Sequence, residues 1–383
     1  MKAAIVEHAG HAPVYGDFQE PATLPGTSVV RVTASAVSHV TKSRASGAHY
    51  SADGGLPRVP GLDGVGIDEA GRRVYFILPE APYGGMAERC LVDARRCIAL
   101  PDGLGDVDAA AMAIPGMSSW AALVERARLR AGETVLVNGA TGASGRLAIQ
   151  VAKHLGAKKV VATGRNAAAF DALRALGADV TIALTADRDA MEQAFKAQFR
   201  AGIDVVLDSL WGPSAETLIV AAAKAGPEAV PIRYVQIGAA SGADITLPGA
   251  ALRSSALQLM GSGIGSIAQP RILAAIRGVL EAAPAAGFRV AVRAMALADV
   301  ARAWDAGDAE SRIVLVPCRR TPRPARAGEA GIPLADRAPT ARSGAATDAL
   351  RRRPSPRNAA LARSVDVGGV RTRQYPHRAA RLG

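Results

Sequence analysis

Residues 135–156 read VLVNGATGASGRLAIQVAKHLG, and this stretch decides the fold. It opens with a short apolar run, Val135 to Val137, of the kind found in buried strands. A helix pattern follows from Arg146 to about Leu155, with apolar residues returning on one face. Between strand and helix lies a turn with a glycine at every third position, at Gly139, Gly142 and Gly145.

This turn has the chemistry of a dinucleotide-binding loop. Small residues let the backbone turn sharply and approach a pyrophosphate, and the free N–H groups at the helix start meet its negative charge. Glycines also serve ordinary turns, so a purely structural loop is the alternative. The strand before the turn, the helix after it and a second strand at the expected distance favour the nucleotide. The predicted cofactor-binding residues of the turn are Gly139, Ala140, Thr141, Gly142, Ala143, Ser144 and Gly145.

Strands and helices alternate downstream of this turn. Further strands are predicted at residues 159–163, 180–184, 203–207 and 234–237, with helices between most of them. Repeated strand–helix units indicate a parallel sheet covered on both faces, so the fold class is α/β. The first third of the chain differs, because strand patterns at residues 28–34 and 73–77 stand among many Gly and Pro residues, which predicts a mostly β domain.

The second strand of the predicted sheet ends in Gly164, Arg165 and Asn166. A site for NAD usually has a carboxylate here for the ribose hydroxyls, whereas a site for NADP offers a cation to the 2′-phosphate. No acidic residue occurs between Leu155 and Phe170, and Arg165 could pair with the phosphate through two hydrogen bonds. The alternative is a solvated Arg165 beside an Asn166 that caps the next helix. We predict NADPH as the cofactor and these three residues as part of its site.

The basic character of the chain is confined to its end. Residues 318–383 hold fifteen Arg, no Lys and four acidic residues, so +11 of the formal net charge of +12 lies there. Repeated Pro, Arg clusters and the lack of a hydrophobic period predict a disordered tail. An out-of-frame extension of a GC-rich gene and an arm that binds nucleic acid are alternative interpretations. The nearly neutral remainder argues against nucleic-acid binding by the folded body.

The composition otherwise favours a cytoplasmic protein. The start of the chain resembles an opening strand and lacks the pattern of a signal peptide. The longest uncharged stretch, residues 254–270, is interrupted by Gly, Ser and Gln, which disfavours a membrane span. Cys90, Cys97 and Cys318 form neither a CxxC pair nor an even set, so no disulfide framework is expected.

Residues 1–317 resemble the quinone oxidoreductase branch of the medium-chain dehydrogenase/reductase superfamily, and residues 135–156 are the most specific part of the resemblance. The resemblance implies a GroES-like, mostly β catalytic domain at residues 1–117, completed by residues 266–317. It implies a Rossmann-type, doubly wound parallel sheet at residues 118–265, and a homodimer. Residues 318–383 have no counterpart in the family pattern. A turn after the fifth strand is implied to pass close to the nicotinamide, at Ile237, Gly238 and Ala239.

No metal site is expected. Zinc-dependent relatives place Cys and His where this chain has Ser38 and Leu62, and serine is a poor zinc ligand while leucine is none. The four cysteines of a structural zinc lobe are missing between Phe76 and Met86. Asp204 and Asp208 flank one predicted strand, and we interpret them as caps of the sheet rather than as a catalytic carboxylate pair.

Without zinc, reducing an electrophilic acceptor is easier than dehydrogenating an alcohol. The resemblance points the same way, so we predict hydride transfer from NADPH to a quinone or an α,β-unsaturated carbonyl. Tyr50 and Ser38 are the candidate catalytic residues, with His39 and His49 as weaker alternatives. Two other functions stay open: an enoyl-thioester reductase, and a catalytically weak NADPH-binding sensor or interaction protein.

Overall fold

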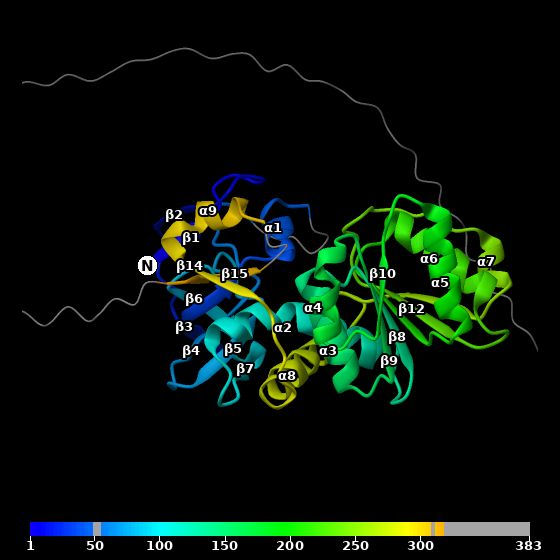
Figure 1. The fold of residues 1–383 in the computed structure, drawn as a ribbon. Helices are drawn as coiled ribbons and strands as arrows, with labels where there is room; N and C mark the ends of the chain where they lie inside the picture. Colours follow the sequence, from blue (N-terminus) through cyan, green and yellow to red (C-terminus); the bar gives the residue numbers. More distant parts are fainter. Residues whose placement is uncertain (49–54, 308–310, 318–383) are drawn as a thin grey trace, which may run out of the picture. The chain divides into compact units, whose positions relative to one another are not determined.

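The computed structural model describes residues 1–48, 55–307 and 311–317. Tyr50, His49 and the whole tail of residues 318–383 lie outside this range, so the predictions made for them stay untested. The described chain contains two large sheets, one parallel and one mixed, and a two-stranded ribbon (Figure 1).

The parallel sheet contains the strands that the sequence predicts around the glycine turn. Its spatial order is β10-β9-β8-β11-β12-β13, and every neighbouring pair is parallel. The strand order reverses between the neighbours β8 and β11, and at such a switch point a crevice opens beyond the carboxyl ends of the strands. The strands are β8 (Thr134–Asn138), β9 (Lys159–Gly164), β10 (Val180–Ala183), β11 (Val205–Asp208), β12 (Ile232–Gln236) and β13 (Leu257–Gly261).

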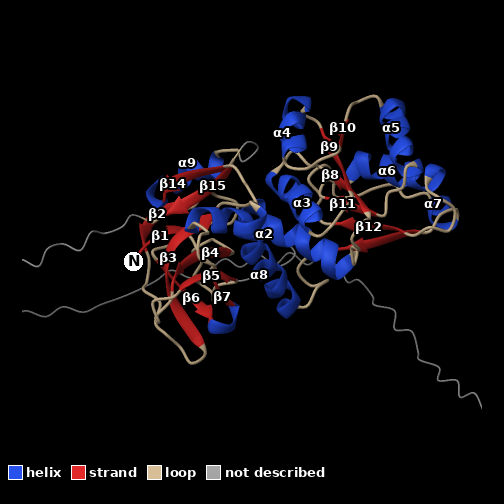
Figure 2. Cartoon of the chain, turned by 60° about the horizontal axis from the view of Figure 1, so that its bottom comes forward, coloured by secondary structure: helices blue, strands red, loops and turns tan. Residues whose placement is uncertain are grey.

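Helices cover both faces of this sheet (Figure 2). Apolar side chains of α3 (Ala143–His154) and α4 (Phe170–Ala175) share one core with α2 (Asp106–Ala121) and α8 (Gln269–Ala286). The opposite face packs against α5 (Arg188–Arg200), α6 (Gly212–Ala225) and α7 (Gly249–Arg253). Strand alternation assigns the faces, since Val235 belongs to the first core and its neighbour Tyr234 to the second.

The mixed sheet is built from both ends of the described chain. Its order is β14-β15-β3-β4-β5-β7, and β6 lies outside this order, where it pairs antiparallel with the first half of β3. The strand patterns predicted at residues 28–34 and 73–77 correspond to β3 and β5. The strands are β3 (Thr27–Ala36), β4 (Asp63–Ile67), β5 (Arg73–Ile77), β6 (Arg89–Asp93), β7 (Cys97–Ala99), β14 (Val292–Ala296) and β15 (Arg312–Val316). The two-stranded ribbon consists of β1 (Lys2–Ile5) and β2 (Val14–Asp17). Two short helices are α1 (His39–Ala45) and α9 (Val300–Asp305).

Helix α2 packs against strands of the mixed sheet and against helices that share a core with the parallel sheet. It contacts β3 and β4 of the mixed sheet as well as α3 and α8, and continues as a π-helical segment, Ala122–Arg126. The expected domain boundary at residue 117 therefore falls inside a helix. By length and composition the stretch Asp106–Arg126 could cross a membrane, yet 67% of its apolar 18-residue window is buried in the protein, as in the core helix of a globular fold.

The Gln150 side chain joins α3 to the segment that leads into β14 by two hydrogen bonds. The Gln150 amide donates to the carbonyl oxygen of Arg289 at 2.9 Å, and its oxygen accepts from the Arg289 N–H at 2.8 Å. Gln150 is buried, so both bonds are shielded from water. This pairing fixes the chain where it leaves the parallel sheet for the mixed one.

Candidate functional site

The glycine turn has a backbone that side chains would disrupt. Gly139 has φ +89, in the left-handed region that favours glycine. A Cβ added at Gly145 would lie 2.4 Å from the carbonyl oxygen of Gly139, so the turn closes on itself there. A Cβ at Gly142 would meet nothing within 4 Å, and open space beside the helix start is what an approaching phosphate needs.

Helix α3 begins in this turn with free amides. Its N-cap is Gly142, and no side chain caps the helix. The first backbone bond runs from the N–H of Arg146 to the oxygen of Gly142. The N–H groups of Ala143, Ser144 and Gly145 make no hydrogen bond within the described part of the chain. Helix α3 is twelve residues long, and the free amides at its start fit the pyrophosphate of a dinucleotide.

A buried hydrogen-bond network holds the turn at the switch point. Asn138 donates to Asp208 at 2.8 Å and accepts from the Thr163 hydroxyl at 2.7 Å. Thr163 Oγ1 in turn accepts from the N–H of Gly139 at 3.1 Å. Tyr234 donates to the second oxygen of Asp208 at 2.7 Å. The side chains come from β8, β9, β11 and β12, so four strands position one loop.

Asp208 also caps the end of β11. Its Oδ1 accepts from the N–H groups of Leu210 and Trp211 at 2.9 and 3.1 Å. Asp204 accepts from the N–H of Thr134 at the other end of the strand, at 2.8 Å. The interpretation of both residues as sheet caps is thus confirmed. Burial, with the charge and hydrogen bond of Asp208, raises the pKa of Tyr234 well above its ordinary value, so its hydroxyl stays a donor.

The end of β9 carries the residues predicted for the 2′-phosphate. Thr141 lies over Gly164, where an added Cβ would be 2.4 Å from the threonine methyl. Arg165 is exposed and makes no ion pair with a described residue. Asn166 accepts from the N–H of Ala168 at 3.1 Å, so its side chain caps a short 3-10 helix. The capping role considered for Asn166 is therefore present, and Arg165 is left as the charged group at this strand end.

The turn after β12 closes on the same switch point. The N–H groups of Ile237 and Gly238 lie 2.7 and 3.2 Å from the carbonyl oxygen of Asp208. A Cβ at Gly238 would lie 2.9 Å from the oxygen of Ser209, so the two turns pass at close range. Ala239 follows and is exposed. The structure thus brings the turn at Ile237 to Ala239 to the strand end that also anchors the glycine turn.

Ser38 begins helix α1. Its hydroxyl accepts from the N–H of Thr41 at 3.0 Å and lies 2.9 Å from the Thr41 hydroxyl. Ser38 is buried, and its oxygen is engaged as an N-cap. Among the described residues no group of three or more His, Cys, Asp and Glu side chains could hold a metal ion.

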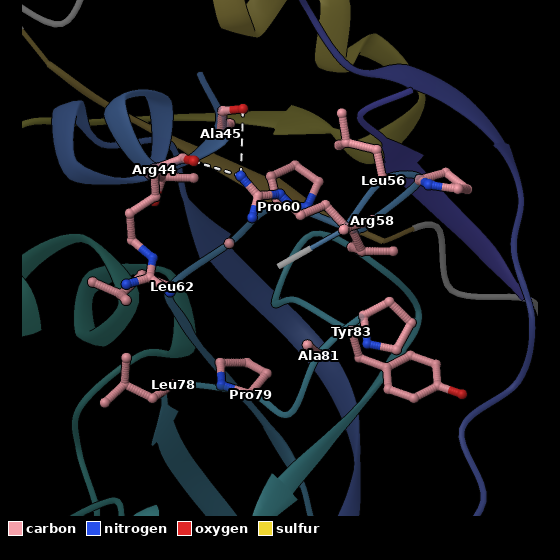
Figure 3. Close-up of a pocket in the computed structure, with 16 residues that line it drawn as sticks. Arg44, Ala45, Leu56, Arg58, Pro60, Leu62, Leu78, Pro79, Ala81 and Tyr83 are labelled. Carbon is pink, nitrogen blue, oxygen red and sulfur yellow. Dashed lines mark hydrogen bonds between the residues drawn. The ribbon is translucent and has the colours of Figure 1, made fainter. Parts of the chain in front are cut away.

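A cavity of about 310 Å³ lies beside α1 (Figure 3). Thr41 and Leu62 line it, together with Leu78 and Tyr83. The Arg58 guanidinium donates to the carbonyl oxygens of Arg44 and Ala45, which closes the carboxyl end of α1 at the cavity wall. The sequence did not reveal this cavity, although the prolines and glycines of residues 55–62 and 79–82 mark its walls.

Asp63 lies directly behind the cavity wall, next to Leu62. It is 1% exposed and accepts from the Tyr75 hydroxyl at 2.8 Å, while its Oδ1 has no hydrogen-bond partner in the described part of the chain. Burial raises the pKa of Asp63 to about 7, against the lowering effects of the Tyr75 hydrogen bond and the Arg312 charge. The sequence offered no signal for this perturbation, because burial of a carboxyl group depends on the surrounding sheet.

Together, a doubly wound sheet, a glycine turn at its switch point and a helix start with free amides define a dinucleotide-binding domain, and the similar proteins make the chain an NADPH-dependent oxidoreductase. The family described as "Zinc-binding dehydrogenase" matches residues 143–294, which exclude Ser38 and Leu62. The chain belongs to the medium-chain dehydrogenase/reductase superfamily and is quinone oxidoreductase-like, as the resemblance implied.

Similar proteins come from several organisms. A protein of Emericella nidulans named "Probable NADPH-dependent quinone reductase" is 28% identical over 83% of this chain and 100% of its own length. The quinone oxidoreductase of Thermus thermophilus, solved also with NADPH, has a TM-score of 0.70 at 28% identity, covering 82% of this chain and 100% of its own.

A third kind of relative is far larger. A "Phthioceranic/hydroxyphthioceranic acid synthase" of Mycobacterium tuberculosis is 34% identical over 203 residues, which are 49% of this chain and 9% of that protein. The likeness therefore concerns one segment of a much longer synthase.

Proposed function

We propose that this oxidoreductase uses NADPH to reduce a small electrophilic acceptor, a quinone or an α,β-unsaturated carbonyl, without zinc. The observation that carries the proposal is the glycine turn at the switch point, followed by a strand end where Arg165 stands and no carboxylate does. The cofactor NADPH also appears in the names of the Emericella nidulans relative and the Thermus thermophilus structure.

The described residues fit the cofactor. The amides of Ala143, Ser144 and Gly145 would hold the pyrophosphate, and Arg165 would pair with the 2′-phosphate. The turn from Ile237 to Ala239 would lie along the nicotinamide half. When bound, NADPH supplies the hydride, and the protein contributes binding and orientation.

The residue types at the zinc-ligand positions favour an electrophilic acceptor. Ser38 is buried as a helix cap and Leu62 is apolar, so neither supports a Lewis acid that would activate an alcohol. A quinone or enone accepts hydride at a conjugated carbon and needs only orientation and a proton afterwards. The cavity beside α1 has the volume of a small-molecule site, and its lining from Leu62, Leu78 and Tyr83 suits an apolar acceptor.

Two residues are the candidates for the proton donor, Ser38 and Tyr50. Tyr50 lies outside the described residues. The hydroxyl pair of Ser38 and Thr41 gives Ser38 a path to the cavity, because Thr41 lines it. Ser38 would then pass a proton through Thr41 rather than touch the acceptor.

An acceptor panel tests the proposed reaction. NADPH oxidation would be followed with 1,4-benzoquinone, an alkyl enone and a crotonyl thioester, and NADP reduction with a simple alcohol. We expect turnover with the quinone or the enone, and none with the alcohol. Turnover with the alcohol that a chelator abolishes would contradict a zinc-free mechanism.

Reduction of an enoyl thioester is the second candidate function. The segment likeness to an acid synthase of Mycobacterium tuberculosis and to a spectinabilin polyketide synthase system protein of Streptomyces orinoci favours it. A kcat/KM for the crotonyl thioester well above that for the free enone would select it.

A homodimer and a cytoplasmic location belong to the proposal as well. Sedimentation tests the homodimer, and cell fractionation tests the location.

A further inference from the structure

Arg146 places a positive charge on the glycine turn. It is the first residue after Gly145 and lies in the first turn of α3. Its Nε donates to the carbonyl oxygen of Thr141 at 3.0 Å, so the side chain folds back from the helix onto the turn. Arg146 is half-buried, and this bond holds its guanidinium in one place beside the turn.

This charge stands where a helix disfavours it. The start of a helix is the positive end of its dipole, so a cation in the first turn is repelled unless an anion offsets it. The first turn of α3 contains no acidic residue. Residues 134–170, from β8 to the start of α4, hold five Lys and Arg residues and no Asp or Glu. A cation kept at this position indicates that a bound anion completes the site.

The guanidinium of Arg146 has donors left for such an anion. An arginine carries five N–H groups, and the bond to Thr141 uses one of them. Nη1 and Nη2 make no hydrogen bond and no ion pair with any residue that the structure describes. Their N–H groups form the planar fork that binds two oxygens of a phosphate.

Thr141 connects this guanidinium to the end of β9. A Cβ added at Gly164 would lie 2.4 Å from the Thr141 methyl, so Thr141 packs directly on that strand end. Arg165 follows Gly164 and is exposed. Because the Arg146 Nε is bonded to the Thr141 carbonyl, its charge lies on the side of the turn that faces this strand end. The 2′-phosphate of a bound NADPH belongs at the same strand end.

We propose that Arg146 is a specificity-determining residue for NADPH, and that its Nη1 and Nη2 donate to the 2′-phosphate alongside Arg165. A phosphate monoester carries a charge of about −1.5 to −2 at pH 7, which two guanidiniums balance. The bond to Thr141 positions the Arg146 fork in advance, so little side-chain entropy is lost on binding. This inference rests on the proposed function, since it requires NADPH at the glycine turn.

Fluorescence titration of Arg146→Gln with NADPH and NADH tests the inference. Glutamine is uncharged and can still donate toward the Thr141 carbonyl, so NADPH should bind about three- to tenfold more weakly while NADH binds as to wild type. Arg146→Lys keeps the charge without the fork, and its NADPH affinity should lie between those of wild type and Arg146→Gln. Arg200→Gln, at an exposed position on α5 across the parallel sheet, is the matched control and should leave both affinities unchanged.

Nucleotide fragments locate the contact. Adenosine 2′-monophosphate should compete more weakly for Arg146→Gln than for wild type, whereas adenosine 5′-monophosphate should compete equally for both. Equal weakening of NADPH and NADH in Arg146→Gln would overturn the inference, because Arg146 would then only hold the turn through Thr141. An unchanged NADPH affinity would overturn it as well. Wild type that prefers NADPH confines either failure to Arg146, whereas wild type that binds neither nucleotide overturns the proposed function too.

Discussion

Asn138 and Asp208 are partners in the register of the parallel strands β8 and β11, and their side chains are joined by a 2.8 Å hydrogen bond. Both residues are fully buried, at the point where the strand order reverses. The bond ties the start of the glycine turn to the carboxylate that also holds the turn after β11. One buried pair thus positions the backbone on both sides of the crevice.

Asn138→Ala should destabilise the protein through this pair. Asp208 would lose a buried charge-assisted partner and Thr163 its acceptor, so we expect a loss of about 1.5–3 kcal/mol in the free energy of unfolding. Urea denaturation measures it. Asn166→Ala, which removes an exposed cap, is the control and should cost about 1 kcal/mol. Equal losses for both variants would show that the network carries no special weight.

Arg165→Ala should remove most of the preference for NADPH over NADH. A charge-assisted pair with the 2′-phosphate is worth about 1.5–3 kcal/mol, so NADPH should bind roughly 10- to 100-fold more weakly while NADH is unaffected. Fluorescence titration with both nucleotides measures the change. Arg174→Ala, on the next helix and paired with Asp171, is the matched control and should leave both affinities as they are. An unchanged NADPH affinity in Arg165→Ala would place the phosphate elsewhere.

Two glycines of the turn should respond differently to alanine. Gly145→Ala forces a Cβ against the Gly139 oxygen, so the protein without nucleotide should lose stability. Gly142→Ala meets open space, so its thermal melting point without nucleotide should stay close to that of wild type. Both variants should bind NADPH more weakly, because the methyl that Gly142→Ala adds stands where a phosphate approaches and Gly145→Ala distorts the turn. Normal NADPH binding by Gly145→Ala would contradict the assignment of the turn.

Asp63 should make stability depend on pH. Its pKa is raised from 3.8 to about 7 in the folded state, so folding favours the protonated carboxyl. This contribution is fully present below about pH 4 and is lost as pH rises through about 7, by about 1.4 kcal/mol per pH unit inside that window.

Asp63→Asn isolates this effect. The amide cannot ionise and its oxygen still accepts from Tyr75, so the variant should lack the decline between about pH 4 and 7. Urea denaturation at several pH values compares the two proteins. Parallel pH profiles for wild type and variant would mean that Asp63 ionises as an ordinary carboxyl does.

Much of the nucleotide half could be predicted from local signals. Strand, turn and helix around Gly139, Gly142 and Gly145 follow from residue types close by in the chain, and β8, α3 and β9 lie close to where the pattern places them. The boundary near residue 117 was harder, because strand–helix alternation begins after it while α2 runs across it, with Pro115 and Gly116 inside the helix. Tight packing of Gly116 against Val279 of α8 explains why a small residue stands there.

The amino-acid sequence by itself determined the class of this protein, because the glycine turn, the strand–helix alternation and the absence of an acid near Arg165 are local facts. Tertiary structure alone decided which polar groups cooperate. Asp208 reaches Asn138 from 70 residues away, Gln150 reaches Arg289 from 139 residues away, and Asp63 becomes perturbed only inside a completed sheet. Burial and partnership depend on segments distant in the chain, and no local pattern encodes which of those segments will meet.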